Sequence, residues 1–185
     1  MSDLKTSNNL TFTRKLTFTA ILTALQIILS RWLGIQTELF QISFGFVPIA
    51  FSAMLLGPVW ASLTALLADF VGTMIAGTGA YNPMFSINAV LYALIFAWFL
   101  YKKEKTAVRI VLCVAVQLVL VAIPLTPLWL YIYFKYIIGS EKAFMLIFTT
   151  KFMASFVEAA IKIAVLIPLC RLLYPRLEKA FKLKN

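Results

Sequence analysis

A single carboxylate, Asp69, lies inside an apolar segment that follows a Gly-Pro dipeptide at 57–58. An acid at the centre of a membrane helix costs about 2.5–3.5 kcal/mol, so it usually faces a cavity or a partner. A small-residue segment at 76–80 comes next, and glycine-rich backbone with almost no charge suits the lining of a ligand cavity. We therefore predict that Asp69 belongs to a binding site. A helix cap or an ion pair with a neighbouring helix is the alternative.

Three charged residues of the last apolar run, Lys151, Glu158 and Lys162, are spaced by seven and four positions. This spacing places them on one face of a helix. Lys151 and Arg31 are expected on the outer side of the membrane, as is Asp69, and both cations could bind an acidic ligand there. The alternatives are that these two side chains reach the outer lipid headgroups and that Lys162 pairs with Glu158.

Hydrogen-bonding and aromatic residues are expected at the same level of the membrane, namely Tyr81, Asn82, Asn88 and Trp129. An ordinary interfacial belt would account for the aromatic members alone. Together with two cations and a carboxylate, however, they predict a pocket for a planar, hydrogen-bonding ligand that also carries negative charge.

The chain carries no signature of an enzyme. It has no histidine, no Gly-x-x-x-x-Gly-Lys-Ser/Thr phosphate loop and no carboxylate cluster for a metal. Its two cysteines, Cys113 and Cys170, lie in apolar runs, where thiols act as small hydrophobic groups. We expect no catalytic residue, metal or cofactor, so ATP hydrolysis for any active transport must come from partner proteins.

The composition predicts an all-α integral membrane protein. Of the 185 residues, 62% are hydrophobic and only 13% are charged, and the mean hydropathy is +0.93. A membrane-spanning helix needs about 20 apolar residues, so a chain of 185 residues has room for about six or seven spans and no separate soluble domain. We therefore expect residues 1–185 to form a single membrane-embedded domain. The first apolar run is interpreted as a retained helix, since no cleavage site follows it. The lysines and arginines responsible for the net charge of +10 gather at the ends of apolar runs, as in membrane proteins, and this distribution argues against a nucleic-acid partner.

The apolar runs predict a bundle of six transmembrane helices, over 15–33, 44–56, 59–75, 84–101, 106–133 and 145–173. Pro124 and Pro127 are expected to interrupt the fifth of them. A semi-polar loop is expected at 34–43. With six spans both termini share one side, and that side then carries 12 of the 17 basic residues. The positive-inside rule therefore predicts cytoplasmic termini in a multi-pass protein of the cell membrane.

The first helix carries a small-x-x-x-small patch at Ala20 and Ala24, a pattern that lets helices approach closely in lipid. Three further short motifs are Gly57-Pro58, Ala68-Asp69-x-x-Gly72 and Gly79-x-Tyr81-Asn82-Pro83. With these motifs, its length and its topology, the chain resembles the bacterial substrate-binding S components of energy-coupling factor (ECF) vitamin transporters, and is most similar to the folate-specific member.

The resemblance implies a subunit that binds its vitamin from outside and then docks onto a transmembrane coupling protein carrying two ATPases. The family's alanine motif, here Ala20 and Ala24, would mediate that docking. Transport would involve toppling of the whole subunit in the lipid bilayer, and the segments 34–43 and 76–83 would gate the pocket.

The chemistry of folate fits the residues listed above. The pterin ring presents an N–H and an amino group side by side, which match a carboxylate such as Asp69. The ring could stack on Trp129 or Tyr81, and the two carboxylates of the glutamate tail could bind Arg31 and Lys151. An S component for another vitamin such as riboflavin, or a membrane scaffold without a ligand, remains as an alternative.

Overall fold

The computed structural model describes residues 12–32, 34–36, 41–76, 81–139, 144–174 and 176. Parts of the predicted loops, including Glu38, the segment 77–80, Glu141 and Lys142, lie outside the described residues, as do both charged ends of the chain.

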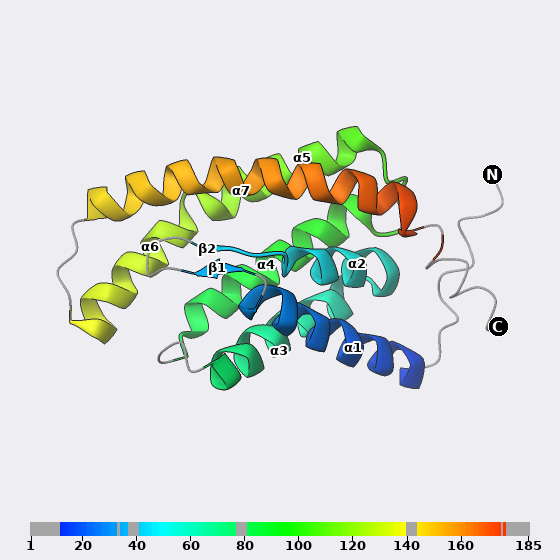
Figure 1. Ribbon diagram of the computed structural model, residues 1–185, viewed down its shortest axis with the longest axis horizontal. Coiled ribbons are helices and arrows are strands. Elements are labelled where there is room, and N and C mark those ends of the chain that lie inside the picture. The colour runs from blue at the N-terminus through cyan, green and yellow to red at the C-terminus, as the bar shows by residue number, and fades with distance from the viewer. Residues whose placement is uncertain are drawn as a thin grey trace.

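The described chain is a bundle of helices that run roughly along one long axis (Figure 1). The helices and strands are α1 (Phe12–Arg31), β1 (Ile35–Gln36), β2 (Gln41–Ile42), α2 (Phe46–Leu56), α3 (Pro58–Ala76), α4 (Pro83–Leu100), α5 (Ala107–Gln117), α6 (Leu125–Ile132) and α7 (Phe144–Leu172). α1 begins and α7 ends at the same end of the bundle (Figure 1). The predicted helix bounds agree with these to within about three residues.

Five of the described helical segments are long and apolar enough to cross a membrane. In α1 and α7 only 17% of the most apolar window is buried within the bundle, so most of their apolar side chains face outward. Such a surface suits contact with lipid rather than water. The sixth predicted span is shorter, because α2 has 11 residues.

α2 is nevertheless the most enclosed helix of the bundle, since it packs against α1, α3 and α4. Nine of its 11 residues are buried, and Ala50 and Ala53 have no exposed surface. Small side chains let the neighbouring helices approach closely. A buried hydrogen bond of 2.9 Å between the Ser52 and Thr64 hydroxyls joins α2 to α3.

Two features differ from the predicted elements. The loop at 34–43 contains an antiparallel pair of two-residue strands, in which Ile35 pairs with Ile42 and Gln36 with Gln41, and so short a pair leaves the predicted all-α class unchanged. The predicted helix over 106–133 is interrupted, but by a wide π-helical turn at Leu118–Ala122, just before the predicted breaks at Pro124 and Pro127, and a second wide turn at Tyr133–Ile138 follows it. The first wide turn precedes Pro124, whose ring nitrogen cannot donate a backbone hydrogen bond.

The turn between α2 and α3 depends on glycine. Gly57 has φ +93° and ψ −176°, a conformation adopted almost only by glycine. A Cβ atom there would lie 2.9 Å from Cζ of Tyr101. We expect Gly57→Ala to lower the free energy of unfolding by about 1–3 kcal/mol, because backbone strain and a steric clash act together.

Gly139→Ala is the matched control for this prediction. Gly139 also has positive φ, +71°, but a Cβ atom there would meet no described atom within 4 Å. Only the left-handed strain, about 1 kcal/mol, applies. Thermal unfolding of both variants in detergent should show the larger loss for Gly57→Ala, and equal losses would contradict the steric part of the argument.

Candidate functional site

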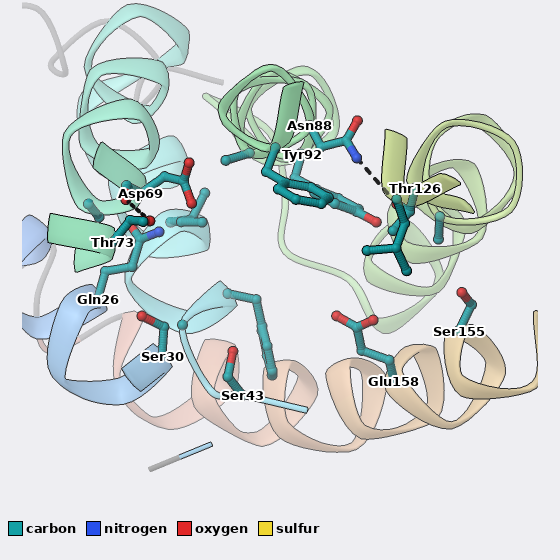
Figure 2. A pocket seen from close by; sticks show the side chains of 18 of the residues that line it. Gln26, Ser30, Ser43, Asp69, Thr73, Asn88, Tyr92, Thr126, Ser155 and Glu158 are labelled. Atoms are coloured by element: carbon teal, nitrogen blue, oxygen red, sulfur yellow. Dashed lines mark hydrogen bonds between the residues drawn. The ribbon is translucent and has the colours of Figure 1, made fainter. Parts of the chain in front are cut away.

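A cavity of about 890 Å³ opens between α1, α2, α3, α4, α6 and α7. This volume lies in the usual range for small-molecule sites. Figure 2 shows polar side chains entering it from opposite sides, with Asp69 and Thr73 on one side and Thr126 and Ser155 on the other. The apolar part of the lining comes from Phe46, Ile49, Phe85, Phe96, Leu130 and Phe134.

On the α1–α3 side, Asp69 and Arg31 form the first charged pair of the cavity. Nη2 of Arg31 lies 3.9 Å from Oδ1 of Asp69 and donates a hydrogen bond of 2.8 Å to the Thr73 hydroxyl. Ser86 of α4 donates a hydrogen bond of 2.6 Å to Oδ2 of Asp69. The carboxylate therefore links three helices as well as lining the cavity, so the alternative of pairing with a neighbouring helix is confirmed and its binding role stays a prediction.

Tyr81 lies behind this pair rather than in the cavity wall. Its hydroxyl lies 2.7 Å from the Ser86 hydroxyl. Because Ser86 gives its one hydrogen to Asp69, Tyr81 is the donor in this bond. The Tyr81 ring also packs edge to face on Phe70, at 5.0 Å between centroids. Tyr81 thus orients Ser86, which in turn orients the carboxylate.

On the opposite side, α7 contributes Lys151, Glu158 and Lys162 to the lining, as their spacing predicts. Nζ of Lys162 lies 3.0 Å from Oε1 of Glu158 and 4.6 Å from the centroid of the Tyr92 ring. The pairing of Lys162 with Glu158, one of the sequence alternatives, is therefore confirmed. Among the described residues, the Lys151 ammonium forms no hydrogen bond or ion pair.

Between these two sides, Asn88 of α4 lines the cavity and is held by α6. Its Nδ2 donates a hydrogen bond of 3.3 Å to the Thr126 hydroxyl, and Nε1 of Trp129 donates one of 3.1 Å to its Oδ1. Thr126 in turn donates to the carbonyl oxygen of Val121, at 3.2 Å, beside the wide turn of the helix. Trp129 is therefore a supporting residue outside the cavity lining.

Two buried amides of the lining retain an unpaired group. Asn82 caps α4 by accepting a hydrogen bond of 3.0 Å from the Met84 amide, but its Nδ2 has no partner among the described residues. The same is true of Oε1 of Gln26 on α1. Leaving such a group unpaired costs about 1–3 kcal/mol, so a bound ligand or water that completes both bonds is favoured.

Of the predicted binding residues, Arg31, Asp69, Asn82, Asn88 and Lys151 line the cavity. Tyr81 and Trp129 lie behind it and hold lining residues. Ala20 and Ala24 are exposed on the outside of α1, away from the cavity.

The predicted binding residues leave out several polar lining residues, of which the main ones are Gln26, Tyr92, Thr126, Glu158 and Lys162. The spacing of the α7 charges placed Glu158 and Lys162 on the same helix face as Lys151, but neither was predicted to bind the ligand. The described part of the chain holds no group of three or more His, Cys, Asp or Glu side chains suited to a metal ion.

Comparison with known proteins identifies relatives in sequence and in structure. The family model "ECF transporter, substrate-specific component" matches residues 14–170. The folate transporter FolT of Clostridium novyi (strain NT) is 37% identical over 115 residues, which are 62% of this chain and 67% of that protein. The folate transporter FolT of Leuconostoc mesenteroides is 35% identical over 119 residues, or 64% of each chain.

A solved structure is similar along most of the chain. A crystal structure of FolT bound with folic acid matches with a TM-score of 0.75 and 30% identity, and the match covers 85% of this chain and 92% of that one. The curated relatives are matched over about two thirds of their length, and the solved structure over nearly all of its own.

Proposed function

Because this chain belongs to the substrate-specific components of ECF transporters, we propose that it is the folate-binding subunit of an ATP-driven importer. Its relatives in two bacteria are named as folate transporters, and a similar solved structure contains folic acid. The chain is a transport subunit and not an enzyme, so partner ATPases supply the energy.

The observation that carries this proposal is the composition of the cavity wall. The wall contains a lysine ammonium without a described partner, Lys151, and unpaired amide groups at Asn82 and Gln26. Aromatic rings of Tyr92, Tyr133 and Phe85 lie among them. A planar heterocycle with an acidic tail would satisfy these groups together, since it offers ring faces, hydrogen-bonding edges and negative charge.

Within the proposed site, Lys151 and Arg31 bind the carboxylates of the glutamate tail. Asp69, Asn82 and Asn88 complete the polar lining. Tyr81 and Trp129 act through Ser86 and Asn88, the groups to which they are hydrogen-bonded.

The proposed importer lies in the cell membrane, with six spans and cytoplasmic termini, and the whole chain forms one domain. α1 then docks through Ala20 and Ala24 onto a transmembrane coupling protein that carries two ATPases. The exposure of both alanines on an apolar helix surface supports this assignment.

Identification of the bound vitamin tests the proposal directly. The purified protein is denatured, and the small molecules released from it are identified by absorbance and mass. We expect about one folate per chain, because the cavity is a single site of suitable volume. A flavin would instead indicate a riboflavin transporter. If nothing is released and no added vitamin raises the melting temperature, a ligand-free scaffold is the better interpretation.

A further inference from the structure

Two carboxylates, Asp69 on α3 and Glu158 on α7, face the cavity from opposite sides (Figure 2). Each lies beside a cation, yet their surroundings differ. The difference indicates which carboxylate is available for the hydrogen-bond donors of a ligand.

Both carboxylate oxygens of Asp69 interact with neighbouring side chains. Oδ2 accepts the short hydrogen bond from Ser86, and Oδ1 faces Arg31. Thr73 completes this group, because it accepts a hydrogen bond from Arg31 and donates one of 2.7 Å to the backbone carbonyl of Asp69. In this arrangement Asp69 joins neighbouring helices and orients the Arg31 guanidinium.

Glu158 is bound on one oxygen only. Oε1 pairs with Lys162, whereas Oε2 forms no hydrogen bond with a described residue. The Glu158 side chain keeps 34% of its surface exposed although it lines a cavity, while Lys162 beneath it is buried. Lys162 also contacts the face of the Tyr92 ring, so the cation is held from two directions. Glu158 is thereby held in one orientation, with one oxygen directed to the ligand space (Figure 2).

The position of Glu158 along α7 separates it from the acid-binding groups. It lies seven residues beyond Lys151 on the same helix face, about 10 Å further along the axis. Lys151, Arg31 and Asn82 lie toward one end of the bundle, near the start of α7, the end of α1 and the start of α4. Glu158 instead lies further along α7, as Tyr92 does along α4. Figure 2 shows both side chains at the cavity together with Thr126.

We propose that Glu158 binds the donor edge of the ligand's heterocycle, that is, the adjacent ring N–H and amino group of a pterin. This assignment rests on the proposed folate function and replaces the expectation that Asp69 binds that edge. The two donors approach Oε2 and the outer lone pair of Oε1, and the ring lies beside Tyr92. The acidic tail then extends along α7 to Lys151 and across the cavity to Arg31, with Asp69 as the positioning residue for Arg31.

The test compares two ligands across matched variants of the full chain. The ligands are folic acid and an analogue in which methyl replaces the 2-amino group, and affinities are measured by quenching of tryptophan fluorescence in detergent. We expect the wild-type protein to prefer folic acid by roughly tenfold to hundredfold, the value of a hydrogen bond to a charged group. In Glu158→Gln this preference should disappear, because an amide presents a donor where the second ligand donor requires an acceptor.

Asp69→Asn is the matched control. It should weaken the binding of both ligands by the same factor, since Arg31 loses its orientation but the donor edge keeps its partner. A preference that survives in Glu158→Gln, or one that is lost in Asp69→Asn, would overturn the assignment.

A second variant guards against misfolding, because Glu158→Gln leaves Lys162 buried without its counter-ion. Glu158→Gln combined with Lys162→Met removes both charges and should show the same loss of preference. Failure of the wild-type protein to bind folic acid would overturn the proposed function, and the assignment with it. Normal folic acid binding with an unchanged preference in the double variant would overturn the assignment alone.

Discussion

Methionine in place of Lys151 is expected to weaken folate binding by roughly 30-fold to 5,000-fold, a loss of about 2–5 kcal/mol. The reason is that a ligand carboxylate would then enter a partly enclosed cavity without the cation that compensates its desolvation. Lys151 forms no ion pair with a described residue, so its removal should leave no charge unpaired in the empty protein. The melting temperature without ligand should therefore stay close to that of the wild-type protein.

Lys135→Met provides a matched control for this prediction. Lys135 is exposed near the same end of the bundle and contacts the rings of Tyr131 and Tyr136, but it does not line the cavity. Titration with folic acid should give wild-type affinity for Lys135→Met and the large loss for Lys151→Met. Equal affinities of the two variants would show that Lys151 does not bind the acidic tail.

Tryptophan at Ala20 and Ala24 is expected to abolish folate uptake while leaving folate binding unchanged. Both alanines are exposed on α1, on the outside of the bundle, so larger side chains there disturb neither the core nor the cavity. A docking partner, however, can approach the helix backbone closely only where side chains are small. Two indole rings would hold the coupling protein away from α1. Uptake by cells and binding to purified protein measure the two effects separately.

Ala164→Trp is the control for this pair. Ala164 is also exposed, but on α7, and it is not part of the predicted docking patch. It should retain uptake if docking is confined to the α1 surface. Wild-type uptake by the Ala20→Trp, Ala24→Trp double variant would rule out this surface as the docking site.

The helices could be predicted without a structure because they depend on residues that are close together in the sequence. Helices in such a protein are defined by long apolar runs and by the residues that interrupt them, and both are read from neighbouring positions. Gly57 ends α2 as expected, and Asn82 and Pro83 start α4 as a side-chain cap followed by proline. Pro124 and Pro127 predicted a break before α6, but the wide form of the turns on either side of α6 and the short strand pair escaped prediction, because neither produces a distinct hydropathy pattern.

The charged residues of the cavity could also be predicted from the sequence around each of them. A charged residue in an apolar run indicates a cavity or a partner wherever it lies, so Arg31, Asp69 and Lys151 were identified by type alone. Residues that support the cavity lining from behind have no comparable signal in the sequence. Trp129 is recognised as a support for Asn88 only from a hydrogen bond between residues 41 positions apart in sequence.

The sequence by itself determined the class of protein, the number and bounds of most helices and the residue types available for binding. The tertiary structure decided which of those residues lie next to one another. It paired Arg31 with Thr73, 42 residues away, enclosed the short helix α2 and gave Glu158 a cavity-facing oxygen above a buried lysine. The physical reason is that hydropathy acts over one helix at a time, whereas a pocket depends on which faces of several helices meet.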